Sequence, residues 1–157
     1  MASTITASQF SVQIIETLTL DGVKRGSKVT SIESSVSEVA RRTMQVTHDT
    51  NGTSIMKFNS TPATGTYDLD TFKYLRITNL DADDSLILQL VESGGSHYTE
   101  LLVGPKKSFI LNSLAIDNQA DIDNGVLTGG AAQYIDEIIG KSTGSAVVEI
   151  EYIVVNS

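Results

Sequence analysis

Cysteine and tryptophan are absent from this chain of 157 residues, which also has only two prolines. Without cysteine the protein can form no disulfide, no thiolate metal site and no thiol nucleophile, so packing alone must stabilise the fold. No apolar run approaches the roughly 20 residues that a membrane helix needs. The first ten residues, MASTITASQF, also lack the basic and apolar regions of a signal peptide. We therefore expect a soluble, unprocessed protein that has no membrane partner.

Basic residues are scarce, since 11 Lys and Arg stand against 19 Asp and Glu, for a net charge of −8. A nucleic-acid partner is not expected, because phosphate neutralisation requires a basic surface. The cations are also unevenly placed. Residues 23–46 form a basic region, with five cations: Lys24, Arg25, Lys28, Arg41 and Arg42. After Lys107 a single cation, Lys141, opposes seven carboxylates. Such polarity is common on solvated surfaces, but it also suits copies of one chain that meet head to tail.

The chain is rich in Ser and Thr, which make up 35 of its 157 residues, and in Val and Ile. These residues favour strand faces and turns over helix interiors. Alternation of apolar and polar residues is the main periodic signal, and it predicts an all-β fold. In the last expected strand, Val148, Ile150, Tyr152 and Val154 should face the core. The expected strands are residues 8–20, 36–48, 53–59, 72–80, 86–92, 97–103, 107–112 and 146–155.

Turn signals separate these strands. Asp21-Gly22 closes the first strand, and Asn51-Gly52 predicts a hairpin with a type I′ turn, in which both central residues have positive φ. Residues 131–142 alternate as a strand, but Ile135 and Ile139 could also mark a helical face. We favour a strand, because the glycines that precede this segment would nucleate a short helix poorly. Residues 111–130 form a polar connection that should cross between sheets or reach a neighbour.

Eight or nine short strands in a chain of this length predict one two-sheet antiparallel β-sandwich, and a jelly roll is the natural eight-strand arrangement. An immunoglobulin-like sandwich is the alternative, although its Cys and Trp markers are missing. We expect the sandwich to span residues 10–157. Residues 1–9 should form an extended N-terminal arm that a neighbouring subunit holds, because free chain ends fray.

Candidate catalytic residues do not combine into an active site. Ser96-His97 lacks the Gly-x-Ser-x-Gly elbow of a serine hydrolase, and neighbours in a strand point to opposite faces. The other histidine, His48, lies near Asn51-Gly52 and could at most pair with His97 on a metal. Residues 140–143, Gly-Lys-Ser-Thr, resemble the end of a phosphate-binding loop, but a strand pattern follows them where the motif needs a helix. We expect no enzymatic activity and no cofactor.

Two acidic turns are weak candidates for a calcium site, because calcium takes hard oxygen ligands from loops. Asp81, Asp83 and Asp84 form the first. The second contains Asp121 and Asp123, followed by Asn124-Gly125, but it lacks the spacing and the closing Glu of an EF-hand loop. Asx-rich turns are commonly structural, so no resident metal is expected.

The segment YLRITNLDADDSLILQLVESGGSHYTELLVGPKKSFIL (74–111) and the ending YIDEIIGKSTGSAVVEIEYIVVNS (134–157) resemble the small virion structural proteins of tailed bacteriophages. In that group a strand with R-I-T-N precedes an apolar strand and a hairpin, an F-I-L strand follows a Gly or Pro turn, and the chain ends on V-E-I-E-Y. The similarity covers residues 72–157. This chain departs from the group at Gly104-Pro105-Lys106-Lys107, where an apolar-Gly-Gly step is usual, which leaves the partner surface of that turn open.

The resemblance implies a non-enzymatic capsid decoration or cement protein, made in the host bacterial cytoplasm and placed on the capsid exterior. Its implied partners are the major capsid protein and copies of itself, as a trimer or other small oligomer. We expect Phe10 and Ile14 to supply apolar contacts, and Lys24, Arg25, Lys28, Arg41 and Arg42 to supply electrostatic contacts. Two alternatives stay open: a phage neck, tail or baseplate component, and a carbohydrate-binding sandwich module, for which the chain offers few aromatic platforms.

Overall fold

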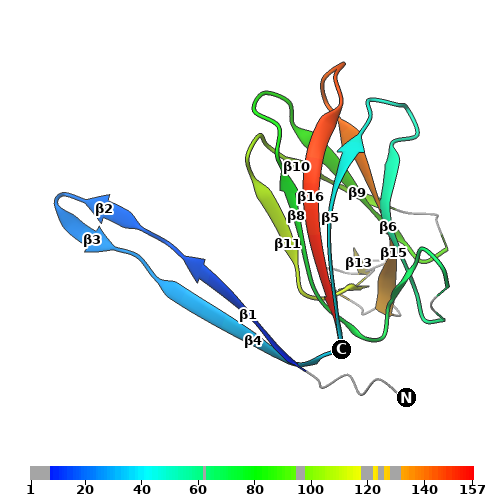
Figure 1. Cartoon of the computed structure of the whole chain (residues 1–157), viewed down its shortest axis with the longest axis horizontal. Helices are drawn as coiled ribbons and strands as arrows, with labels where there is room; N and C mark the ends of the chain where they lie inside the picture. Colours follow the sequence, from blue (N-terminus) through cyan, green and yellow to red (C-terminus); the bar gives the residue numbers. More distant parts are fainter. Residues whose placement is uncertain (1–7, 62, 95–97, 118–121, 124–125, 128–131) are drawn as a thin grey trace, which may run out of the picture.

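The computed structural model describes residues 8–61, 63–94, 98–117, 122–123, 126–127 and 132–157 (Figure 1). All regular structure in these residues is β, so the prediction of an all-β fold is confirmed. No helix with the length and apolar character needed to cross a membrane occurs among them. The described residues form a body of two larger sheets and one long hairpin that extends away from it.

The body contains two mainly antiparallel sheets. The four-stranded sheet has the order β11 (Ser108–Leu111), β8 (Phe72–Asn79), β16 (Val148–Asn156), β5 (Glu38–Val46). The six-stranded sheet has the order β10 (Tyr98–Val103), β9 (Leu86–Glu92), β15 (Ala132–Ser142), β6 (Thr53–Asn59), β7 (Tyr67–Asp68), and β12 (Ala115–Asp117) pairs with β15 at one end. The short β6–β7 contact is the one parallel pairing among the described strands.

The eight longer strands of the body pair in a nested order. β5 pairs with β16, β6 with β15, β8 with β11, and β9 with β10. The first strand therefore lies beside the last, the second beside the second last, and so on inward. Successive pairs alternate between the sheets, which are completed by the β8–β16 and β9–β15 ladders.

One apolar core joins the two sheets. It contains Leu75 and Ile77 from the four-stranded sheet, and Leu88 and Ile138 from the six-stranded sheet, all 0% exposed. Four further core residues were predicted from alternation in the last strand, and they are 0–2% exposed as predicted: Val148, Ile150, Tyr152 and Val154. The alternation of the chain therefore encodes the inner face of the body directly.

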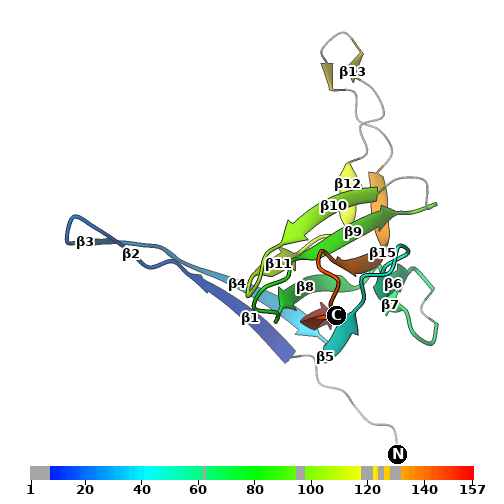
Figure 2. The same ribbon diagram turned by 90° about the horizontal axis from the view of Figure 1, so that it is seen from above.

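The hairpin that extends from the body consists of residues 8–36, called the arm below. At its root β1 (Ser8–Ile15) pairs with β4 (Lys28–Val36), and at its tip β2 (Leu18–Leu20) pairs with β3 (Val23–Arg25). Both views show the tip far from the body (Figures 1 and 2). Asp21 and Gly22 have φ of 50° and 76°, so they form the two-residue turn with positive φ that suits a tight hairpin.

The two ladders of the arm meet at an irregular joint. There the Glu16 N–H donates to the Ser27 carbonyl at 2.9 Å. A side-chain carbon on Gly26 would lie 2.1 Å from the Glu16 carbonyl oxygen, so the strands approach too closely for any residue but glycine. The predicted strand 8–20 is therefore split in two, and the return strands β3 and β4 were not predicted.

The hairpin predicted at Asn51-Gly52 is wrong. β5 and β6, which flank this turn, belong to different sheets, so the turn carries the chain from one sheet to the other. Of its two central residues only Gly52 has positive φ, at 69°. The turn is closed by the Gly52 N–H, which donates to the Asp49 carbonyl at 3.0 Å. The sequence signal located the turn correctly, but each flanking strand has a distant partner.

Other expectations on the organisation of the chain have mixed outcomes. The strand over 131–142 is confirmed as β15, which begins at Ala132. The connection 111–130 contains β12 and two short paired strands, β13 (Ile122–Asp123) and β14 (Val126–Leu127). Most of the predicted arm 1–9 lies outside the described residues, and its last two residues, Ser8 and Gln9, already belong to β1. That a neighbouring subunit binds residues 1–9 stays a prediction.

Gly140 in β15 offers a test of the contact between the sheets. An added side-chain carbon would lie 2.8 Å from Ile55 Cδ1 and 3.2 Å from both methyl groups of Val46. We expect Gly140→Val to lower the free energy of unfolding by about 1–3 kcal/mol through overpacking, measured by urea denaturation. Gly104→Ala is the control, since its new carbon would meet only Lys107 Cγ, at 3.7 Å. Equal midpoints for both variants would contradict the described packing.

Candidate functional site

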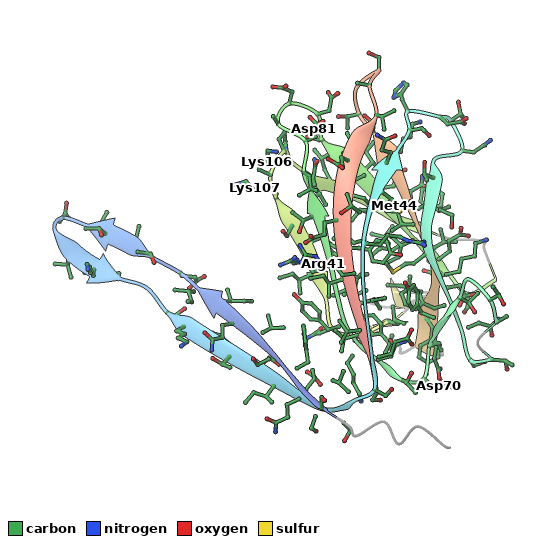
Figure 3. All side chains as sticks on the ribbon, viewed as in Figure 1. Arg41, Met44, Asp70, Asp81, Lys106 and Lys107 are labelled. Carbon is green, nitrogen blue, oxygen red and sulfur yellow. The ribbon has the colours of Figure 1, made fainter. Side chains whose placement is uncertain are left out.

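The most unusual surface of the protein is the arm, which exposes large apolar side chains on both faces (Figure 3). Seven of them are 49–65% exposed: Ile14, Ile15, Leu18, Leu20, Val23, Val29 and Ile32. Burying the exposed part of each would contribute about 1 kcal/mol. A two-stranded hairpin is at best marginally stable in water without a partner for its apolar face. The arm therefore has the character of a contact surface.

The root of the arm is fastened to the outer face of the four-stranded sheet. The Phe10 ring lies on Tyr74, with ring centroids 5.2 Å apart. Val12 and Val36 pack into the same small cluster with Val155. Of the two predicted apolar contact residues, Phe10 therefore contributes to this attachment, whereas Ile14 is 49% exposed. The attachment leaves the outer half of the arm without packing against its own body.

The structure does not bring the five predicted contact cations together. Lys24, Arg25 and Lys28 lie toward the end of the arm, where the described residues offer them no ion pair. Arg41 and Arg42 are adjacent residues of β5 in the body and point to opposite faces of its sheet. The basic region read from the sequence is thus two separate groups, one on the arm and one on the body.

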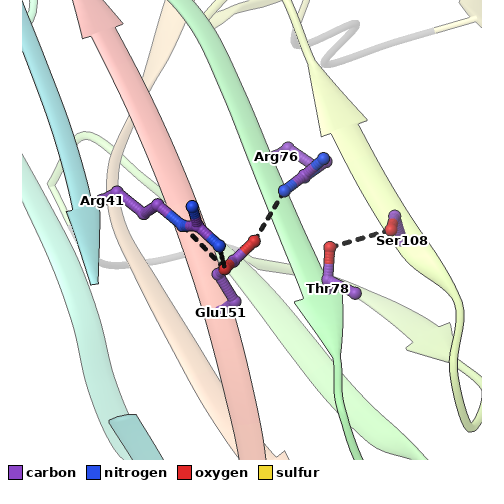
Figure 4. A network of polar contacts seen from close by, with 5 residues as sticks. All are labelled: Arg41, Arg76, Thr78, Ser108 and Glu151. Atoms are coloured by element: carbon purple, nitrogen blue, oxygen red, sulfur yellow. Dashed lines mark hydrogen bonds and ion pairs between the residues drawn. The ribbon is translucent and has the colours of Figure 1, made fainter. Parts of the chain in front are cut away.

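Arg41 takes part in a polar network on the outer face of the four-stranded sheet (Figure 4). Its Nε donates to Glu151 Oε2 at 2.8 Å, and its Nη2 donates to the same oxygen. Arg76 Nη2 donates to the other carboxylate oxygen, Oε1, at 2.6 Å. These arginines, first Arg41 and then Arg76, lower the pKa of Glu151 against the opposing effect of its burial. Glu151 thereby ties three strands together, since Arg41, Glu151 and Arg76 lie on β5, β16 and β8.

Arg42 lines a cleft of about 600 Å³ between β5 and the β6–β7 side of the body. Glu38 and the phenol groups of Tyr67 and Tyr152 also line it, and the two hydroxyl oxygens are 3.3 Å apart. Burial raises the pKa of Tyr67, and its hydrogen bond with Tyr152 raises it further. The Tyr67 phenol therefore keeps its proton near pH 7, and the cleft can offer hydrogen bonds to a polar ligand.

Asn79, the last residue of the R-I-T-N strand, is fully buried and organises one end of the body. Its Nδ2 donates to the carbonyls of Asp84, Val103 and Gly104 at 2.9–3.2 Å. Its Oδ1 accepts from the Asp81 N–H at 2.9 Å. The residue therefore holds the acidic turn against the Gly-Pro-Lys-Lys turn. This role of Asn79 was not predicted from the sequence. The signal for it is a polar residue at a strand position that faces the core.

The first calcium candidate is an ordinary Asx-type turn. Asp81 Oδ1 accepts from the N–H groups of Asp83 and Asp84 at 2.8 and 2.9 Å, and these bonds lower the pKa of Asp81. The Asp84 carboxylate lies against Gly144. Asp121 of the second candidate lies outside the described residues, and only the backbone of Asp123 is described. In the part of the chain that the structure describes, no three carboxylate or imidazole groups are arranged to hold a metal.

The remaining candidate residues from the sequence either form hydrogen bonds and strands of the fold or lie outside the described residues. Ser96 and His97 are not among the described residues. His48 Nδ1 is 3.0 Å from the Ser142 carbonyl oxygen, to which it can only donate. Residues 140–142 are part of β15, and Ser142 is 0% exposed. Their backbone amides belong to a sheet and not to the start of a helix, so they do not form a phosphate-binding loop.

The network around Glu151 predicts a pH dependence of stability. The folded-state pKa of Glu151 lies below its unfolded value of about 4.3, so its contribution is present above that pH and is lost as the pH falls through the lower folded-state value. We expect Glu151→Gln to reduce the free energy of unfolding at pH 7, with the difference from wild type shrinking below about pH 4. Denaturation series at pH 3–7 would measure this, and a difference independent of pH would contradict it.

No protein-family model, curated protein or solved structure matches the chain. Its two distinctive features are the nested strand pairing of the body and the exposed apolar arm with its basic tip. An exposed apolar surface of this kind typically marks an interaction site.

Proposed function

We propose that this protein is a non-enzymatic structural component of a virion, most specifically a decoration or cement protein of a tailed-bacteriophage capsid. The observation that carries the proposal is the combination of strand order and arm. Pairing of the first strand with the last, and of each next strand inward, supports an eight-stranded jelly roll in a two-sheet sandwich. Jelly rolls recur in viral capsid proteins, and the resemblance of residues 72–157 points in the same direction.

The mechanism is one of binding free energy. Each copy would bury the apolar side chains of its arm, such as Ile15, Leu20 and Val23, against neighbouring subunits. A protein that contacts several lattice subunits at once stabilises the assembled shell, because opening the shell must first break all of those contacts. The proposed partners are the major capsid protein and further copies of this chain. The proposed location is the exterior of the capsid, after synthesis in the bacterial cytoplasm.

The arm and body have separate tasks in this proposal. The body is stabilised by its own core and by the Arg41–Glu151–Arg76 network, so we expect it to fold without a partner. The outer half of the arm exposes apolar groups that gain stability only on contact. The same division of tasks would suit a neck, tail or baseplate component, which differs in the symmetry of its assembly and in its partner.

The proposal is tested with purified protein and with capsids of the encoding phage from which it has been removed. We expect the protein to sediment with these capsids and to raise their melting temperature. Leu20→Ser combined with Val23→Ser should weaken this binding at least tenfold, about 1.4 kcal/mol, because both side chains lie at the tip and are 52–54% exposed. The stability of the body should not change.

The matched control is Val147→Ser, which removes an apolar side chain that is 45% exposed on the body. This variant should bind capsids as the wild type does. A protein that leaves the capsids unaltered but binds purified tails or necks would move the assignment to those structures. Binding to no virion part would refute the structural function.

A carbohydrate-binding function is supported by one specific feature. A depression of about 440 Å³ is lined by Tyr134, Asp70, Asp136 and Asn59, and the Tyr134 side chain is 42% exposed. An exposed aromatic ring beside carboxylate and amide groups is suited to stacking on a sugar and to hydrogen bonding with its hydroxyls.

If this depression binds glycans, Tyr134→Ala should reduce binding on a glycan array at least tenfold, whereas Tyr98→Ala, which removes another exposed tyrosine, should leave it unchanged. A wild-type protein that binds no glycan on the array would exclude this second candidate.

A further inference from the structure

We propose that the arm of one copy docks against strand β10 of a second copy, at the free edge of its six-stranded sheet. This inference specifies the self-association within the proposed function and rests on that part of the proposal alone. Two complementary surfaces support it. The arm has apolar faces and a basic tip, and the β10 edge of the body is apolar and acidic.

Within the part of the chain that the structure describes, the outer half of the arm has no partner for its apolar side chains. The register places Ile14 opposite Val29 and Leu20 opposite Val23, so apolar pairs lie on the arm both near its middle and at its tip. Figures 1 and 2 show that the tip points away from the body in two perpendicular views. The outer edges of a two-stranded hairpin also carry backbone groups that can pair with a further strand. Because no other described element reaches the tip, we infer that a second molecule supplies its partner.

Strand β10 has the properties of such a partner. Among the described strands it pairs only with β9, so its other edge is free. Leu101 and Val103 face the core, while Tyr98 and Leu102 face outward and are 60% and 68% exposed. Glu100 lies between them and accepts from Gln89 Nε2 at 2.7 Å. Addition of a strand to a free edge combines backbone hydrogen bonds with contacts of alternate side chains.

Charge favours this edge over the other edges of the body. Residues 18–28 of the arm contain Lys24, Arg25 and Lys28 against Asp21, whereas residues 37–157 contain eight Lys and Arg against sixteen Asp and Glu, a net charge of −8. A basic tip is thus attracted to the body of another copy.

The competing edges are short or basic. β5 carries Arg41 and Arg42, β11 directly follows Lys106-Lys107, and β7 is only two residues long. Lys106 and Lys107 lie together at one end of the body in Figure 3. The remaining edge strand of the six-stranded sheet, β12, has only three residues. In contrast, β10 has six residues and combines exposed apolar side chains with a carboxylate and no cation.

The absence of native cysteine allows a direct test by disulfide trapping with purified protein and no capsids. Val23→Cys at the arm tip and Leu102→Cys on β10 are prepared separately, mixed and oxidised. Both positions are exposed, so both variants should keep the wild-type unfolding midpoint. We expect a disulfide between the two variants to form at least tenfold faster than in a mixture of Val23→Cys with Val147→Cys. Equal rates in the two mixtures, or trapping mainly between two Val23→Cys chains, would overturn the inference.

A charge-reversal series tests the same contact without cross-linking. Light scattering of the wild-type protein should show an oligomer, and Lys24→Glu combined with Arg25→Glu should raise its dissociation constant about tenfold. Glu100→Lys in the same chain should recover at least part of this loss, because the attraction is then restored with the signs exchanged. A monomeric wild type, or no recovery, would overturn the inference. This experiment contains no capsid, so its result is independent of capsid binding. A monomer that binds capsids would support the proposed function and refute the docking of the arm on β10 of a second copy.

Discussion

The ladder between β5 and β16 is the constraint on which the other features depend. It joins the first strand of the body to the last over nine residue pairs, from Val148–Val46 to Asn156–Glu38. The intervening strands pair in the nested order within this frame, and their apolar faces form one core. The arm runs into β5 with a single residue, Ser37, between the strands, so the same ladder determines where the arm leaves the body. It also brings Arg41 to Glu151, which adds charge-assisted hydrogen bonds to the outer face.

Strand positions in the body could be predicted from the sequence because alternation is a local signal. The alternation of the last strand predicts a core face without knowledge of its partner strands. The four residues of this face are buried: Val148, Ile150, Tyr152 and Val154. Partner choice could not be read in this way. Asn51-Gly52 resembles a hairpin turn, yet the strands beside it find partners about a hundred residues away for β5 and about eighty for β6. A turn signal describes the backbone at the turn and carries no information on which sheet the following strand joins.

The candidate contact surface was predicted only in part, for a related reason. Lys24, Arg25 and Lys28 were noted for their charge, but the return strand of the arm was missed because residues 23–35 have no buried face that would impose clean alternation. Charge counting also grouped Arg41 with the arm cations, although a glutamate more than a hundred residues further along the chain binds it. Residues that serve a contact outside the chain leave a weaker pattern than core residues, since the periodicity of a strand reflects what it packs against in its own fold.

The joint at Gly26 divides the arm into two mechanically distinct halves. The root is held by Phe10 on Tyr74, whereas the tip beyond Gly26 has its own short ladder and its own turn. The tip lies away from the body in Figures 1 and 2, so we expect substitutions in it to leave the folding of the body and the root unaffected. A lineage that carried this chain to a new partner could change a loop of about ten residues, Leu18 to Lys28, and retain the whole scaffold.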